Sequence, residues 1–245
     1  LGPASLAKRY VRPLHHGSRF VHSYTKLLEW PYMKKIILII ILLAVAGCVA
    51  YNYAFRAPSA PSQDVGSTVE TTYLDVQGRT VYKISKDSKV EFKIDEVLND
   101  KPFTAVGTTS EIAGDIFITG DKIEIGTLAI NARTFKTDSE KRDGAIARFI
   151  LKSELAVNEF MYFKPTEVTG TPSSFTATGD LTISGVTKPA TFTATAQIVN
   201  NVLTGTATIN LKRSDFNITI PEVKSVASVD DEFTVTAQVV APRAQ

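Results

Sequence analysis

The sequence predicts an all-β domain, an antiparallel lipocalin-like barrel of about eight strands, preceded by an N-terminal apolar segment. Short stretches of alternating apolar and polar residues recur between residues 79 and 243, and turn residues separate them at hairpin spacing. So many short strands in one domain favour closure into a barrel, because closure removes unpaired strand edges. The third observation is one long uncharged apolar run that precedes these strands.

That apolar run extends from Ile36 to Phe55 and follows the pair Lys34 and Lys35. As a helix, 20 residues span about 30 Å, the thickness of the hydrocarbon core of a bilayer. We therefore predict a membrane anchor over residues 33–55. The lysines should stay cytoplasmic, and the domain that follows should be exported to the periplasm or the cell surface.

A lipoprotein signal is the main alternative to an anchor. Residues 45–48 have the sequence Val-Ala-Gly-Cys, which resembles a lipobox behind a short apolar region, and cleavage would leave a lipidated Cys48. A conventionally cleaved signal peptide is a third alternative. We favour the uncleaved anchor because the residues after Cys48 remain apolar, and all three alternatives place the domain outside the cytoplasm.

The residues that flank this segment should lie outside the fold. Residues 1–32 precede Met33, which we expect to be the natural start, although a basic tail that touches anionic lipid is the alternative. Residues 56–78 are rich in Ala, Pro and Ser at their start and predict a linker, so the barrel should occupy residues 79–243.

Charge and composition exclude several classes of function. The whole chain has a net charge of +2, but residues 79–243 carry 19 Lys and Arg against 21 Asp and Glu, which leaves no basic stripe for nucleic acid. Cys48 is the single cysteine, and His15, His16 and His22 all precede the apolar run. We therefore expect no disulfide, no metal site and no cofactor in the barrel.

The predicted strands follow one another along the domain with a period of two residues. Their approximate ranges are 81–84, 90–95, 116–119, 123–130, 160–163, 175–177, 181–183, 192–198, 203–211 and 233–239. In the late strands the apolar face carries small residues, at Ala194, Ala196, Gly205 and Ala207. Small inward residues leave volume in a lumen, and an eight-stranded barrel can hold one small ligand.

One segment, Asp138–Leu155, breaks the strand pattern. Ile146, Phe149 and Ile150 have helical spacing, and Asp138 or Ser139 is a suitable N-cap. The sequence therefore predicts a short helix that packs this apolar stripe against one mouth of the barrel, although Gly144 weakens the helix by about 1 kcal/mol.

The segment Gly179–Phe192, with the sequence GDLTISGVTKPATF, predicts a β-hairpin. The expected turn is Gly-Val-Thr-Lys-Pro at 185–189, in which Gly185 can adopt a positive φ and Pro189 fixes φ where the chain enters the next strand. This hairpin also resembles the signature hairpin of the YceI-like family of lipocalin-like, polyisoprenoid-binding proteins. Three further segments in the same order strengthen the resemblance, which spans Tyr82 to Ala241: they are 88–92 with Gly107 and Gly114, 130–143, and 212–218.

The resemblance implies an elongated barrel that encloses an apolar tunnel for a long isoprenoid or isoprenoid-quinone-type lipid. Many members carry a His near the start of the helix and a His-Leu-Gly loop after the first strand. This chain instead has Gly144-Ala145 and the sequence DEVLNDK at 95–101, so the head-group contacts should differ.

Candidate lumen residues are the large apolar side chains of the predicted strands and helix, although many such residues are ordinary core. They are Phe92, Ile94, Phe117, Phe149, Phe160, Phe163, Phe175, Phe192 and Phe216. Candidate head-group residues are Arg213, Asp215 and Arg142. The explanation that we favour for Arg213 and Asp215 is nevertheless a structural ion pair at a strand end, and for Arg142 and Asp143 it is solvated helix charges.

We therefore predict an exported, membrane-tethered protein that holds a polyisoprenoid or similar lipid for storage or transport. The alternative is a ligand-free structural or interaction module of the cell envelope. An enzyme is not expected, because the barrel has no histidine, no cysteine nucleophile and no G-x-S-x-G motif. The expected partners are the membrane, through Ile36–Phe55, and an apolar lipid; a homodimer is left open.

Overall fold

A computed structural model describes residues 30–55, 64–69, 78–221 and 226–244 of the chain. The chain divides into two compact units, residues 1–51 and 52–245. Most of α1 (Trp30–Phe55) belongs to the first unit, and the stretch Tyr32–Asn52 of this helix has a mean hydropathy of 2.4. By length and composition this is the one helix in the described part of the chain that could cross a membrane, a property that it would share with a signal sequence.

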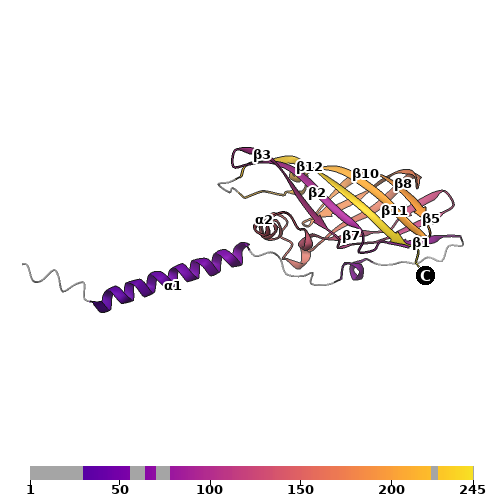
Figure 1. Cartoon of the computed structure of the whole chain (residues 1–245). Helices are drawn as coiled ribbons and strands as arrows, with labels where there is room; N and C mark the ends of the chain where they lie inside the picture. The colour runs from indigo at the N-terminus through magenta and orange to yellow at the C-terminus, as the bar shows by residue number, and fades with distance from the viewer. Residues whose placement is uncertain (1–29, 56–63, 70–77, 222–225, 245) are drawn as a thin grey trace, which may run out of the picture. The chain divides into compact units, whose positions relative to one another are not determined.

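The described residues of the second unit form twelve strands (Figure 1). They are β1 (Thr80–Lys83), β2 (Lys89–Leu98), β3 (Lys101–Thr109), β4 (Ile112–Ala113), β5 (Asp115–Thr119), β6 (Lys122–Ile125), β7 (Leu128–Asn131), β8 (Phe160–Thr171), β9 (Ser174–Ile183), β10 (Val186–Val199), β11 (Val202–Lys212) and β12 (Val226–Pro242). Short helical turns η2 (Val65–Thr68), η3 (Ala132–Thr134), η5 (Ala156–Asn158) and η6 (Arg213–Phe216) connect or flank them.

The strands form two sheets in which all neighbours are antiparallel. A nine-stranded sheet has the order β3-β2-β12-β11-β10-β9-β8-β7-β4 and curls into a nearly closed barrel, and β1-β5-β6 form a smaller sheet. A bridge between Tyr82 and Arg243 joins the two sheets. The predicted antiparallel barrel is therefore confirmed, with nine strands in the main sheet.

The edges of the nine-stranded sheet meet at a seam. There Thr108 of β3 and Lys136 exchange two backbone hydrogen bonds of 2.8 Å, the one bridge that joins β3 to the segment after β7 in the described residues. The hydroxyls of Thr109 and Thr134, 2.6 Å apart, lie next to it. Everywhere else around the sheet, each strand is held to its neighbour by a ladder of register pairs.

Two elements differ from the sequence prediction, the turn of the signature hairpin and strand β3. The turn of the signature hairpin consists of Ser184 and Gly185 alone, with φ of 49° and 78°, and Pro189 lies inside β10. Pro189 fits there because β11 pairs with β10 only from Thr193 onward, so its missing N–H breaks no ladder on that side. The unpredicted strand β3 carries mostly small residues, Ala105 and Gly107 among them, on its inward face.

The predicted helix is present but shorter than expected. Helix α2 (Glu140–Ala145) starts after Ser139 and passes into a π-helical turn, η4 (Ile146–Ile150), in which the Leu151 N–H donates to the Ile146 carbonyl. This wider turn rotates the apolar stripe, so Ile146 and Leu151 are buried while Phe149 is 44% exposed. The prediction that Ile146, Phe149 and Ile150 form one apolar stripe against the barrel is therefore wrong for Phe149.

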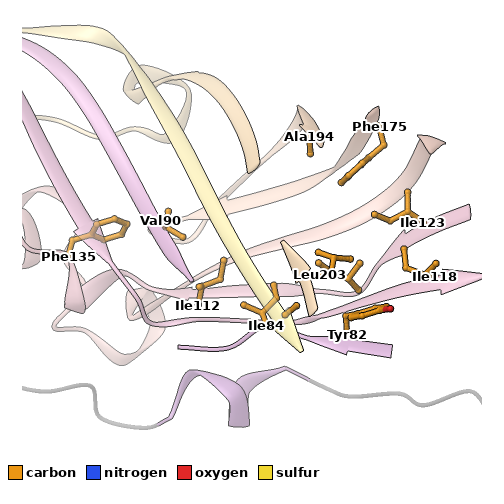
Figure 2. Close-up of a cluster of buried hydrophobic side chains, with 12 residues drawn as sticks. Tyr82, Ile84, Val90, Ile112, Ile118, Ile123, Phe135, Phe175, Ala194 and Leu203 are labelled. Atoms are coloured by element: carbon orange, nitrogen blue, oxygen red, sulfur yellow. The ribbon is translucent and has the colours of Figure 1, made fainter. Parts of the chain in front are cut away.

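Three hydrophobic clusters hold the unit together. The largest joins the small sheet to the interior of the barrel and includes Tyr82, Ile84, Ile118, Phe175 and Leu203 (Figure 2). A second packs η6 and η4 against the barrel around Phe216, Ile146 and Ile183.

The third cluster places Val65 of η2 against Ala129 and Phe160. Part of the predicted linker, residues 64–69, therefore packs on the barrel unit. Residues 1–29, 56–63 and 70–77, on which the remaining predictions for the extension and linker depend, lie outside the described residues.

Candidate functional site

The strand registers define which side chains face the interior of the barrel. Ala194, Ala207, Ala237 and Val90 are consecutive partners across β10, β11, β12 and β2, and all four belong to the largest cluster or pack against it. Because side chains alternate along a strand, every second residue from these positions also points inward. The threonines between them, such as Thr208, face outward.

A cavity of about 50 Å³ lies within this interior, large enough for a few water-sized groups. Its lining is almost entirely apolar and combines the small sheet with the late strands of the barrel. The lining residues are Ile84, Ile112, Ile116, Ile123, Ile125, Leu128, Phe175, Phe192, Ala194, Thr195, Ala196, Leu203, Gly205, Thr206, Ala207, Ala237 and Val239. The four small residues that the sequence predicted to face the lumen are all among them, so that prediction is confirmed.

The apolar wall of the lumen continues beyond the cavity. At one end of the barrel the inward residues Leu203 and Ala241 are 1% and 0% exposed. The inward residues that follow on β11 and β12, as far as Leu211 and Phe233, are only half-buried. In a barrel filled by its own side chains such positions would be buried. The described lumen is therefore incompletely filled along β11 and β12.

Two aromatic pairs narrow the lumen. The ring centroids of Phe163 and Phe192 lie 4.9 Å apart, and those of Phe92 and Phe135 lie 5.4 Å apart. Gly107 of β3 accommodates the ring of Phe92, since a Cβ at this position would lie 2.2 Å from its Cε1 atom. The pair Phe92–Phe135 therefore fits tightly against β3.

Five of the nine predicted lumen residues face the interior. Phe175 and Phe192 line the cavity, and Phe163 contacts Phe192. Phe92 packs against the largest cluster inside the barrel and against the second cluster around η6, and Ile94 follows it in the same inward phase on β2.

The other four predicted lumen residues lie elsewhere, since alternation places two of them on the opposite face of their strands. Phe160 packs under Val65 in the third cluster, and Phe117 lies beneath the guanidinium of Arg79, 3.7 Å from the ring centroid. Phe149 is exposed on the π-turn, and Phe216 is buried in the cluster around η6.

Arg213 binds the backbone of its own neighbourhood. Strand β11 ends at Lys212, so Arg213 and Asp215 lie on the turn η6 and do not share a strand face. The guanidinium of Arg213 donates to the carbonyls of Asp230, Ile218 and Val229 at 2.8, 3.1 and 3.2 Å. It thereby satisfies carbonyls at the bulge of β12, and the expected pair with Asp215, which is exposed, does not form.

Two carboxylates outside the lumen have perturbed titration. Both the N–H and the hydroxyl of Ser214 donate to Asp231, and these bonds lower the pKa of Asp231. Hydrogen bonds from Lys89 and then Lys93 lower the pKa of Glu91 on the outer face of β2. Neither shift creates a catalytic acid or base, which would require a pKa raised toward neutrality.

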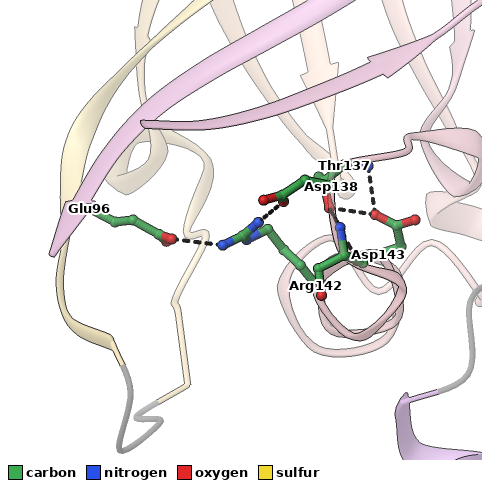
Figure 3. A network of polar contacts seen from close by, with 6 residues as sticks. Glu96, Thr137, Asp138, Arg142 and Asp143 are labelled. Carbon is green, nitrogen blue, oxygen red and sulfur yellow. Dashed lines mark hydrogen bonds and ion pairs between the residues drawn. The ribbon is translucent and has the colours of Figure 1, made fainter. Parts of the chain in front are cut away.

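A polar network lies where the inward face of β2 reaches α2 (Figure 3). Nη2 of Arg142 lies 3.0 Å from Oε1 of Glu96, and Nη1 pairs with Asp138. The Arg142 guanidinium also lies 5.1 Å from the ring centroid of Phe103, the cross-strand partner of Glu96. Arg142 is therefore partly buried between two carboxylates and an aromatic ring.

Asp143 is buried beside this network. The sequence had suggested that it is a solvated helix charge, and that prediction is wrong. Asp143 accepts hydrogen bonds of 2.7 Å from both the N–H and the hydroxyl of Thr137, and Lys136 lies 3.6 Å away. No motif in the sequence assigned a role to Glu96. Glu96 follows Phe92 and Ile94 along β2 at a spacing of two residues, and this alternation was the available signal that its side chain faces inward.

Within the described residues, no group of three or more His, Cys, Asp or Glu side chains is arranged to hold a metal ion. An antiparallel barrel with an apolar, incompletely filled lumen is the architecture of a lipocalin-like binding protein.

Comparison with known proteins identifies the family. The YceI-like domain matches residues 82–241, and the chain therefore belongs to the YceI-like family. No curated protein sequence matches the chain.

Two solved structures, BcnA and a polyisoprenoid-binding domain, share the fold. BcnA of Burkholderia cenocepacia has a TM-score of 0.55 at 18% identity, covering 64% of this chain and 99% of BcnA. A polyisoprenoid-binding domain from Saccharophagus degradans, implicated in plant cell wall breakdown, has a TM-score of 0.50 at 10% identity, covering 66% of this chain and 98% of that domain. A YceI protein of Campylobacter jejuni has a TM-score of 0.49 at 19% identity, covering 57% and 85% of the respective chains.

Proposed function

We propose that this protein binds one long isoprenoid or isoprenoid-quinone-type lipid in its barrel and stores or transports it without catalysis. The observation that carries the proposal is the half-buried apolar wall of β11 and β12, which continues the cavity. Each methylene group that leaves water contributes about 0.8 kcal/mol, before the cost of ordering the chain. Family membership and the polyisoprenoid-binding domain with the same fold support an isoprenoid as the ligand.

A long chain needs more room than the cavity offers. We expect it to occupy the cavity and to extend along the half-buried wall, with the rings of Phe92 and Phe192 adjusting their rotamers. Phe92, Ile94, Phe163, Phe175 and Phe192 are the predicted residues that we retain as ligand contacts.

We further propose that the barrel is exported and held at the cytoplasmic membrane by α1. The apolar stretch Tyr32–Asn52 and the lysines that precede it support this arrangement. Lipidation at Cys48, which is exposed on α1, and removal of the helix as a signal remain the two alternatives.

Native mass spectrometry of residues 56–245 tests the lipid proposal. The fragment contains every described strand of the second unit, and the matching solved structures of BcnA and the polyisoprenoid-binding domain consist almost entirely of the equivalent domain, which supports testing it without α1. We expect a stoichiometric adduct with the mass of a long isoprenoid that is lost on organic extraction. Protein that is isolated without lipid and takes up no added isoprenoid quinone would favour a ligand-free envelope module instead.

A further inference from the structure

The lumen leads toward the polar network described above. From the cavity, inward positions continue along β2 through Phe92 and Ile94 to Glu96. At about 3.3 Å per residue, Glu96 lies about 13 Å along the strand from Phe92. The intervening Ile94 and its partner Phe233 on β12 are half-buried, so the apolar surface of the wall continues up to the carboxylate.

The ion pair at this position is not explained by stability alone. The Glu96 side chain is 8% exposed and that of Arg142 19%. Burying such a pair costs desolvation energy that its own attraction often fails to repay, and an apolar pair would serve packing equally well. A polar pair at the end of an apolar lumen is instead suited to the polar end of an amphipathic ligand.

The pair has hydrogen-bonding capacity to spare. Arg142 uses Nη1 and Nη2 on Asp138 and Glu96 and retains further N–H donors. Oε1 of Glu96 accepts from Arg142. Oε2 of Glu96 accepts no hydrogen bond from the described residues. It is also not one of the buried side-chain atoms among them that lack a hydrogen-bond partner, so it is not fully buried. The site can therefore donate to a carbonyl or hydroxyl oxygen and accept from a hydroxyl.

The net charge of this polar network disfavours a negatively charged lipid head group. Arg142 is neutralised by Glu96 and Asp138, and Lys136 offsets Asp143, so the five side chains together carry one negative charge. A phosphate would have to displace a carboxylate from Arg142 or remain close to it, and like charges in a partly buried site repel strongly.

We infer that the Glu96–Arg142 pair binds the head group of the lipid and selects a neutral one, a quinone carbonyl or an alcohol, against a phosphate. This inference rests on the proposed lipid-binding function and deepens it. The same carboxylates that would repel a phosphate leave a neutral oxygen free to accept from Arg142 at little electrostatic cost.

Competitive binding to residues 56–245 tests the inference, with an isoprenoid quinone, a polyprenol and a polyprenyl monophosphate of equal chain length. We expect both neutral lipids to bind at least about tenfold more tightly than the phosphate, since a charge-assisted contact typically changes affinity by that factor. Arg142→Gln should weaken the neutral lipids by about tenfold.

A change of preference is the sharper readout. Glu96→Gln removes one carboxylate and releases Arg142, so binding of the phosphate should rise about tenfold while binding of the neutral lipids changes by less than about threefold. Glu140→Gln is the matched control, because Glu140 is exposed on the same helix outside the network. Asp138→Asn, at a side chain that is 64% exposed, should shift preference in the same direction if Glu96→Gln folds poorly.

The outcomes separate the two proposals. A wild-type protein that binds the phosphate as tightly as the neutral lipids, or variants with unchanged preference, would overturn the head-group inference and leave the lipid-binding function intact. A wild-type protein that binds none of the three lipids would overturn both.

Discussion

Arg133 and Glu159 form an ion pair across the base of the α2 segment, with Nη2 and Oε2 3.2 Å apart. The Glu159 side chain is 1% exposed, and its Oε1 accepts a hydrogen bond of 3.1 Å from Asn131. The same guanidinium donates through Nε and Nη2 to the carbonyl of Ser153. Arg133 therefore ties the chain that follows η4 to the end of β7 and the start of β8.

Loss of Glu159 should destabilise the barrel strongly. In Glu159→Ala, Arg133 and Asn131 lose their buried acceptor, and removing one member of a buried pair typically costs about 3–5 kcal/mol. The free energy of unfolding from urea denaturation of residues 56–245 measures this loss. Glu154→Ala is the control, since that carboxylate is 42% exposed in its pair with Arg148 and should contribute less than about 1 kcal/mol. Equal losses in the two variants would contradict the assigned role of Glu159.

Filling the lumen should block lipid without harming the fold. Ala207→Phe places a ring in the cavity, so we expect bound lipid to fall at least about tenfold, with a change in stability of less than about 3 kcal/mol. Lipid extracted per mole of protein is the measurement. Thr208→Phe adds the same ring on the outer, exposed face of β11 and should leave lipid content unchanged. Lipid loss in both variants would show that the effect is not specific to the lumen.

The contact between Gly107 and Phe92 predicts a coupled pair of substitutions. Gly107→Ala forces a methyl group onto the Phe92 ring and should cost about 1–3 kcal/mol of stability. In the Phe92→Leu background the smaller side chain leaves room, so the same substitution should cost measurably less. A double-mutant cycle by chemical denaturation gives the coupling energy. If the two losses of stability are additive, the ring of Phe92 does not pack tightly against Gly107 of β3.

Acid should loosen the turn η6 through Asp231. Its pKa is lowered in the folded protein, so this carboxylate stabilises the turn at pH values above its ordinary pKa of 3.8. That stabilisation declines as the pH falls through the lower pKa that Asp231 has in the folded protein. We expect the NMR signal of the Ser214 amide to shift below about pH 4, as the carboxylate gains its proton. In Asp231→Asn the shift should be absent, and a shift that persists would assign it to another group.

The π-turn of η4 predicts unequal costs for two neighbouring apolar residues. Ile146→Ala removes a buried side chain and should cost about 2–5 kcal/mol. Phe149→Ala removes a side chain that is 44% exposed and should cost less than about 1 kcal/mol. Thermal and chemical denaturation of both variants tests this ordering. A larger loss for Phe149 would restore the regular helix that the sequence suggested.

The sequence was sufficient for the features that depend on alternation. The inward phase of Ala194, Ala196, Gly205 and Ala207 follows from a period of two residues, and the structure places all four at the cavity. Alternation also decides against Phe160 and Phe117, whose strand neighbours are the ones that face inward.

The remaining features depend on contacts between distant segments or on local backbone changes. The pair Glu96–Arg142 joins residues 46 positions apart, so no local pattern reveals it. The π-turn shifts Phe149 by less than one helical turn, which an apolar stripe of three residues cannot resolve. Arg213 lies outside the strand because β11 ends at Lys212 and the chain enters the turn η6, although a period of two residues would have placed Arg213 in the inward phase of Leu211.

The seam between Thr108 and Lys136 makes one side of the barrel mechanically compliant. Around a complete ring of ladders, the diameter changes only if many hydrogen bonds break together, whereas here two backbone bonds carry the bridge. Phe92 lies against Gly107, next to Thr108, and its partner Phe135 precedes Lys136, so one of the two aromatic pairs that narrow the lumen lines this seam. We therefore expect that uptake of a bulky chain would widen the lumen by parting this bridge, while the ladders of β8 to β12 stay intact.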